Sequence, residues 1–229
     1  MSERDILVNN KYFRSIKDIN DEHIEQQIVL IENLHKIFLE YKGYGATRIN
    51  SIVGKRIENI KVIIKRLKKD LQKRQQLLYL NDMDSFILEN GEGILARGEE
   101  GLSYLKDIDY IGIIKRSMKK NEITLGRTDE RNLIVTSNLE IGSLKNVSYN
   151  LVEEDVYDYL RRVRIKRHNI DLEKYINKYI DSAYLSKDSK YYIELLLMIP
   201  YEALRIWNRY INNKSEDYNY YLQNIKSRI

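Results

Sequence analysis

Glycine and proline are distributed so unevenly along this chain that they constrain its fold more than any other feature. The 229 residues include only ten glycines and one proline, Pro200, and no glycine follows Gly142. Because these two residue types interrupt regular structure most strongly, the last third of the chain is predicted to be almost continuous helix. So few breakers also exclude a loop-rich all-β protein.

The composition is typical of a globular chain with a buried core, at 43% hydrophobic and 32% charged residues. The absence of cysteine excludes disulfides, thiolate zinc sites, iron–sulfur clusters and a cysteine nucleophile. We see no signal peptide, and the longest apolar run, Leu195–Pro200, is too short to span a bilayer, so no membrane partner is expected. The net charge of +5 permits an acidic partner without requiring one.

Hydrophobic periodicity predicts a mainly α protein with one small β hairpin. We divide the chain into an N-terminal extension (1–20, irregular), a principal domain (21–212) and a C-terminal polar tail or helix (213–229). Helices are expected at 22–42 (ending at Gly43), 55–80, 153–167, 171–183, 187–198 and 200–212. Two or three shorter helices, broken by Gly91, Gly93, Gly98 and Gly101, are expected within 82–120. The hairpin pairs Leu133–Val135 with Leu139–Leu144.

The helix expected at 55–80 is strongly basic and amphipathic. Nine lysines and arginines lie between Lys55 and Gln76, against only Glu58 and Asp70. Its apolar stripe should pack on the core and leave all nine basic side chains in solvent. A solvated face is the simplest interpretation, and contact with an acidic partner is the functional one. The candidate partner-binding residues are Lys61, Lys65, Lys68 and Lys69.

The three histidines, His23, His35 and His168, stand in separate elements with no second ligand at metal-binding spacing. We therefore predict no metal site and no cofactor. His35 lies in an amphipathic helix, so a packed or half-exposed side chain is expected there.

The segment from Ile123 to Ile134 resembles the catalytic loop of aminoglycoside-phosphotransferase-like kinases, in which His-Gly-Asp is followed by four residues, an Asn and an apolar strand. Gly126, Asn132 and the strand match this pattern. Leu125 stands where the family has His, and Arg127 where it has the catalytic Asp. Further on, Ser143 stands where the resemblance places a metal-binding Asp, and 156–160 resembles the start of the family's next helix.

Weaker motifs over residues 20–212 resemble the spore-coat (CotS-type) branch of this superfamily. They are Asn33-Leu34-His35, Tyr41-Lys42-Gly43-Tyr44, Gly54-Lys55, Arg162-Val163-Arg164, Lys187-Asp188, Ile199-Pro200-Tyr201-Glu202 and Trp207-Asn208-Arg209-Tyr210. The resemblance implies the helical C-lobe of a kinase-like fold, made in the mother-cell cytoplasm and then assembled with other proteins into the spore coat.

The departures from the family pattern imply a protein without catalytic activity. Arg127 cannot accept a proton, and Ser143 is a poor ligand for magnesium. About 20 residues precede the first helix, so we expect the nucleotide-binding N-lobe to be missing.

Two alternatives remain open. One is a phosphotransferase of small molecules in which Asp129 or Glu130 has taken over and a partner chain supplies the nucleotide lobe. The other is a basic helical nucleic-acid-binding protein, which the lack of aromatic residues on the basic face disfavours.

Overall fold

The computed structural model describes residues 6–14, 19–39, 49–167, 169–213 and 217–228. The predicted helix stop at Gly43, the motif at 41–44 and His168 lie outside these residues. Contacts divide the chain into two compact units. The first comprises residues 1–53 and 108–194, and the second 54–107 and 195–229.

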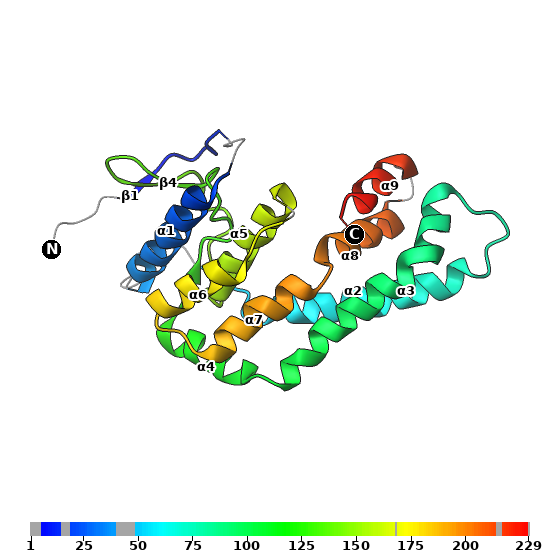
Figure 1. Cartoon of the computed structure of the whole chain (residues 1–229), viewed down its shortest axis with the longest axis horizontal. Coiled ribbons are helices and arrows are strands. Elements are labelled where there is room, and N and C mark those ends of the chain that lie inside the picture. Colours follow the sequence, from blue (N-terminus) through cyan, green and yellow to red (C-terminus); the bar gives the residue numbers. More distant parts are fainter. Residues whose placement is uncertain (1–5, 15–18, 40–48, 168, 214–216, 229) are drawn as a thin grey trace. The chain divides into compact units, whose positions relative to one another are not determined.

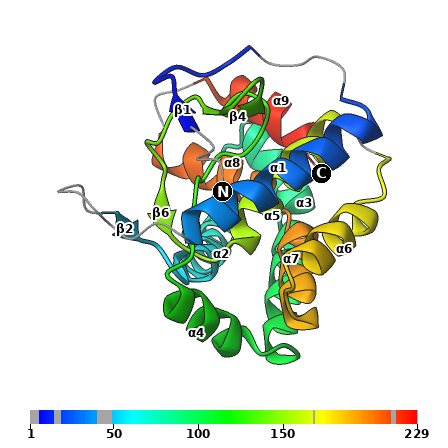
Figure 2. The same ribbon diagram turned by 90° about the vertical axis from the view of Figure 1, so that its left-hand side faces the viewer.

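The first unit combines helices with two small sheets (Figures 1 and 2). Its helices are α1 (Asp21–Leu39), α4 (Tyr110–Lys120), α5 (Glu153–Lys166), α6 (Glu173–Ser182) and most of α7 (Lys187–Met198), which continues into the second unit. Helix α1 lies against both α5 and α6. Its buried face carries Ile24, Ile28, Ile31 and Leu34, as the periodicity predicted.

Each sheet has three strands, two of them antiparallel neighbours and one added in parallel. The strands are β1 (Ile6–Val8), β2 (Asn50–Ser51), β3 (Ile123–Thr124), β4 (Leu133–Val135), β5 (Leu139–Ile141) and β6 (Ser148–Tyr149). The strand orders are β1-β5-β4 and β2-β6-β3. The β4–β5 pairing confirms the predicted hairpin, with Leu133 opposite Ile141.

The prediction of a single hairpin and of an irregular segment before residue 21 was wrong, because two further segments of the chain add parallel strands. Ile6 pairs with Leu139, and Asn50 pairs with Ser148, both in parallel register. Such pairing joins segments that are far apart in the chain, and strands of two or three residues leave no periodicity to detect.

The second unit is a group of helices (Figure 1), and their buried apolar side chains form its core. It contains α2 (Lys55–Arg74), α3 (Asp82–Ser103), the 3₁₀ turn η1 (Tyr104–Lys106), α8 (Tyr201–Asn212), α9 (Tyr218–Lys226) and the end of α7. Helices α3 and α8 both contact α2 and α9. The predicted stripe on α2 is buried throughout, from Ile57 to Leu71. Helix α2 ends at Arg74 rather than near 80, because its buried face ends there.

Helix α3 runs without interruption through four glycines, so the prediction that these glycines break the segment was wrong. The 82–120 segment is divided instead after Ser103, where η1 separates α3 from α4. Three of these glycines lie where neighbouring side chains reach the helix backbone. A Cβ atom on Gly91 would lie 2.9 Å from Trp207, one on Gly98 would lie 3.0 Å from Ile64, and one on Gly101 would lie 2.5 Å from Ile199. The glycines therefore permit close helix packing rather than turns.

Gly91 and Gly93 provide a matched test of this packing role. Nothing lies within 4 Å of a Cβ atom on Gly93, so Gly93→Ala should stabilise the fold by about 0.5–1 kcal/mol through helix propensity. Gly91→Ala must displace Trp207 and should cost about 1–3 kcal/mol. Urea unfolding of both variants measures the difference. Equal stabilisation by the two alanines would contradict the packing role.

Candidate functional site

The loop that resembles a kinase catalytic loop connects β3 to β4 in the first unit. Gly126 adopts φ +73°, a backbone conformation that residues with a Cβ atom rarely adopt. A Cβ atom there would also lie 2.8 Å from the backbone oxygen of Asn146. Both observations explain why glycine occupies this position.

Asp155, in the first turn of α5, holds this loop in place. Its buried carboxylate accepts hydrogen bonds from the backbone N–H groups of Leu125 and Gly126, both at 2.8 Å. The hydroxyl of Thr128 also donates to the backbone oxygen of Asp155, at 3.1 Å. The start of α5 therefore packs against the β3–β4 loop.

His35 completes this arrangement from α1. Its Nε2 lies 3.0 Å from Asp155 Oδ2, and its Nδ1 lies 2.8 Å from the hydroxyl of Tyr179. Because a carboxylate only accepts, the proton of a neutral His35 sits on Nε2, and Nδ1 accepts from Tyr179. Burial raises the pKa of Tyr179 well above its usual range, which keeps that hydroxyl a donor. His35 is thus buried and fully engaged in hydrogen bonds.

Asn132 joins the loop to the segment that follows β5. Its Nδ2 donates to the backbone oxygens of Arg127 at 2.9 Å and Ser143 at 3.1 Å. Its buried Oδ1 has no hydrogen-bond partner among the described residues. The four positions of the resembled loop, Leu125, Gly126, Arg127 and Asn132, therefore lie in one segment. Asn132 connects this segment to Ser143, the fifth position that the resemblance singles out.

Arg127 is paired within the loop. Its Nε and Nη2 donate to the two carboxylate oxygens of Asp129, at 2.9 and 3.1 Å, and its guanidinium lies 4.8 Å from the ring centre of Tyr12. The hydrogen bond to Asp129 raises the pKa of Arg127, so the positive charge is permanent. Arg162 approaches the same carboxylate at 3.7 Å. Asp129 is therefore surrounded by two cations.

Glu130 is already paired with a lysine, and Ser143 has a neutral hydroxyl in place of a carboxylate. Glu130 is 7% exposed and accepts a hydrogen bond from Lys166 at 2.7 Å. The Ser143 hydroxyl accepts from the backbone N–H of Lys145 at 3.3 Å, and it carries no charge. No group of three His, Asp or Glu side chains suited to a metal ion occurs among the residues that the structure describes.

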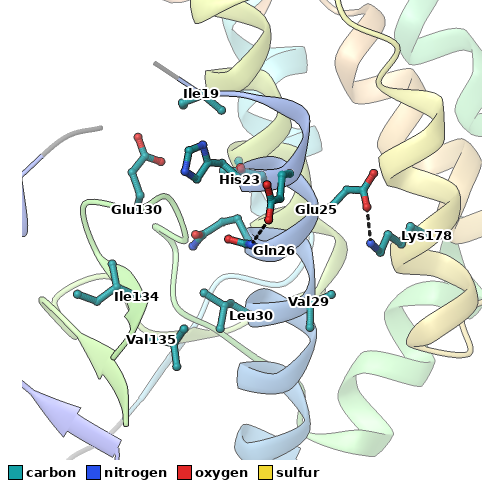
Figure 3. A pocket seen from close by; sticks show the side chains of 13 residues that line it. Ile19, His23, Glu25, Gln26, Val29, Leu30, Glu130, Ile134, Val135 and Lys178 are labelled. Atoms are coloured by element: carbon teal, nitrogen blue, oxygen red, sulfur yellow. Dashed lines mark hydrogen bonds and ion pairs between the residues drawn. The ribbon is translucent and has the colours of Figure 1, made fainter. Parts of the chain in front are cut away.

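A cavity of about 530 Å³ lies between α1 and the β4 side of the first unit (Figure 3). It is lined by apolar side chains such as Leu30 and Val135 and by Glu130, but not by the other loop residues named above. At its rim Glu25 accepts from Lys178 at 3.0 Å, and the two nearby lysines, 174 and 178, lower the pKa of Glu25 to about 2. The sequence contained no signal for this cavity.

The predicted basic surface lies on α2, in the second unit. Lys61 and Lys68 form ion pairs with Glu58 and Glu99, and Lys65 and Lys69 are exposed. The expectation that all nine basic side chains face solvent was wrong. Arg74 is 8% exposed, because it pairs with Asp70 and Asp84 inside the unit.

The fold of this chain is shared with a solved phosphotransferase structure. It is similar to the crystal structure of an aminoglycoside phosphotransferase from Alicyclobacillus acidocaldarius, with a TM-score of 0.73 and 14% sequence identity. The match covers 90% of this chain and 60% of that one. At this identity the likeness establishes the fold and not the activity. No family model and no curated protein sequence matches the chain significantly.

Asp155 itself was not singled out from the sequence. The available signal was the run Glu153-Glu154-Asp155 at a helix start, which is also an ordinary way to stabilise a helix N-terminus. Only the fold shows that one of these three carboxylates binds the loop.

We predict that Asp155→Ala destabilises the first unit by about 3 kcal/mol or more, because two buried N–H groups and His35 lose their acceptor. Asp181→Ala removes an exposed carboxylate from α6 and should change stability by less than about 0.5 kcal/mol. Urea unfolding measures both. A small effect at Asp155 would show that the loop does not depend on this carboxylate.

Proposed function

We propose that this chain is a non-catalytic, kinase-like scaffold protein of the bacterial spore coat. The observation that carries the non-catalytic part is Arg127, which occupies the position of the catalytic carboxylate in the resembled loop and is paired with Asp129. The spore-coat role, the mother-cell origin and the assembly with other coat proteins rest on the CotS-type resemblance alone.

The chemistry of phosphoryl transfer supports this proposal. Transfer to a hydroxyl requires a carboxylate that orients the hydroxyl or accepts its proton, and further carboxylates that hold the metal ion bridging the phosphates. Arg127 is a permanent donor, and its charge repels a cation. Ser143 supplies a neutral oxygen in place of a metal-binding carboxylate.

The alternative in which Asp129 or Glu130 replaces the missing carboxylate is disfavoured by their contacts. Arg127 binds both oxygens of Asp129, and Lys166 binds Glu130. A substrate hydroxyl would have to displace these partners from largely buried carboxylates.

The scaffold role assigns a partner-binding surface to α2. Lys65 and Lys69 are exposed without an ion pair among the described residues, whereas Lys61 and Lys68 are partly neutralised. An acidic coat protein would be attracted to this surface over about 8–10 Å at physiological salt.

Calorimetric titration with ATP and magnesium tests the non-catalytic part. We expect no saturable heat at millimolar nucleotide, because Arg127 and Ser143 cannot hold a metal–phosphate complex. The phosphotransferase from Alicyclobacillus acidocaldarius serves as the positive control for the fold. Saturable binding with a micromolar Kd would contradict the proposal and favour the phosphotransferase alternative.

Restoring one carboxylate should not restore activity. Arg127→Asp leaves Ser143 in place, so the transition-state charge still lacks its metal clamp, and we expect no phosphate transfer above background. Arg131→Asp, at an exposed position of the same loop, controls for the charge change. Phosphate transfer by the Arg127 variant but not by the Arg131 variant would show that the remaining parts of an active site are present.

A further inference from the structure

The connection between α2 and α3 presents four consecutive large apolar residues to solvent. Leu77 is 48% exposed, Leu78 93%, Tyr79 91% and Leu80 44%. In Figure 1 this connection extends beyond the ends of the two helices it joins. We call residues 77–80 the apolar tip. Folded domains rarely leave such a contiguous group of large apolar side chains uncovered without a use for it.

The apolar tip is held in place at both ends. On the α2 side, Arg74 pairs with Asp84 of α3. On the α3 side, Asn81 forms a capping box with Asp84, in which each side chain accepts from the other residue's backbone N–H. The hydroxyl of Tyr210 also donates to Asp84 at 2.8 Å. The exposure of the tip is therefore a property of the folded unit and not of a frayed helix end.

Basic side chains lead along α2 to the apolar tip. Lys65, Lys69 and Lys73 recur every four residues on the exposed face, and none forms an ion pair with another described residue. Successive members of this row lie about 6 Å apart along the helix axis. Asp70 and Asp84 are both paired with Arg74, and Asp82 is the exposed acid at the start of α3. The α2 face behind the tip is thus positively charged, whereas the first half of α3 carries the exposed acids Asp82, Glu89 and Glu92.

We infer that the apolar tip inserts into the interface of an anionic lipid bilayer, with Lys69 and Lys73 at the level of the lipid headgroups. A tip of four residues offers far less surface than the roughly 800 Å² that each partner of a stable protein complex buries. A protein partner would also need a pocket shaped to receive it, whereas a bilayer accepts a small convex insertion. Tyrosine and leucine favour the interfacial region, and lysines extend their ammonium groups to anionic headgroups.

This inference shares Lys69 with the surface that the proposed function assigns to an acidic partner, but it does not require that function. It revises the expectation of no membrane partner. That expectation rested on the lack of a segment long enough to span a bilayer. Within the described residues, no helix combines the length and apolar character needed to cross a membrane. Insertion at the surface requires only a few apolar side chains together with positive charge.

Co-sedimentation of the full chain with phosphatidylcholine vesicles, with and without phosphatidylglycerol, tests the inference. We expect binding to the anionic vesicles that weakens with salt. The double variant Leu78→Ser with Tyr79→Ser should bind at least about tenfold more weakly. The control, Met118→Ser with Tyr184→Ser, removes two exposed apolar side chains from the first unit, where they are 64% and 91% exposed, and should bind like the wild type.

The contribution of the lysines is tested by two double variants that change the net charge by the same amount. Lys69→Gln with Lys73→Gln should weaken binding to anionic vesicles by roughly thirtyfold, since each lysine near the surface contributes about as much as a fivefold change. Lys61→Gln with Lys68→Gln, whose lysines are already paired with glutamates, should have a smaller effect.

Three outcomes would overturn the inference. The first is no binding to either vesicle, and the second is equal loss of binding in the tip variant and its control. The third is concentration-dependent self-association that the tip variant abolishes while vesicle binding is absent, which would assign the tip to a second copy of the chain. ATP binding by the wild type would contradict the proposed function and leave this test unaffected.

Discussion

The arrangement of the first unit depends on the hydrogen bonds that the carboxylate of Asp155 accepts. This carboxylate stands at the start of α5, where the positive end of the helix dipole favours a negative charge, and it binds two backbone N–H groups of the β3–β4 loop. Through His35 and Tyr179 the same carboxylate is connected to α1 and α6. A single buried charge thereby positions three helices and the loop, and each polar atom in this chain of contacts has a partner.

A second buried cluster ties α4 and α7 to the start of α5. The guanidinium of Arg116 donates to both oxygens of Glu122 and both oxygens of Glu153, and also to the hydroxyl of Ser189. Bidentate pairing of this kind fixes orientation as well as charge. This cluster involves the residue before β3 and the first residue of α5, and none of the loop positions Leu125, Gly126, Arg127 and Asn132.

The second unit combines close helix packing with a buried ion-pair cluster of its own. Trp207 lies against Gly91 of α3, and its indole N–H donates to Asp70 of α2 at 2.8 Å. Asp70 in turn binds Arg74, which is bound to Asp84 at the start of α3. This contact chain holds the base of the apolar tip. The exposed tip and the buried tryptophan are thus parts of one arrangement.

The sequence by itself determined the helices, the central hairpin and the class of fold. Periodic apolar residues identified α1, α2 and α5–α8, and the resemblance of the segment around Gly126 and Asn132 to a kinase catalytic loop implied the fold. These features are local, and local spacing is what a sequence displays directly. The tertiary structure alone decided that α3 passes through four glycines, that Ile6–Val8 joins a sheet, and that Asp155 binds the loop. Each of these depends on residues distant in the chain, because whether a glycine ends a helix, or a carboxylate binds an N–H group, is decided by what lies against it.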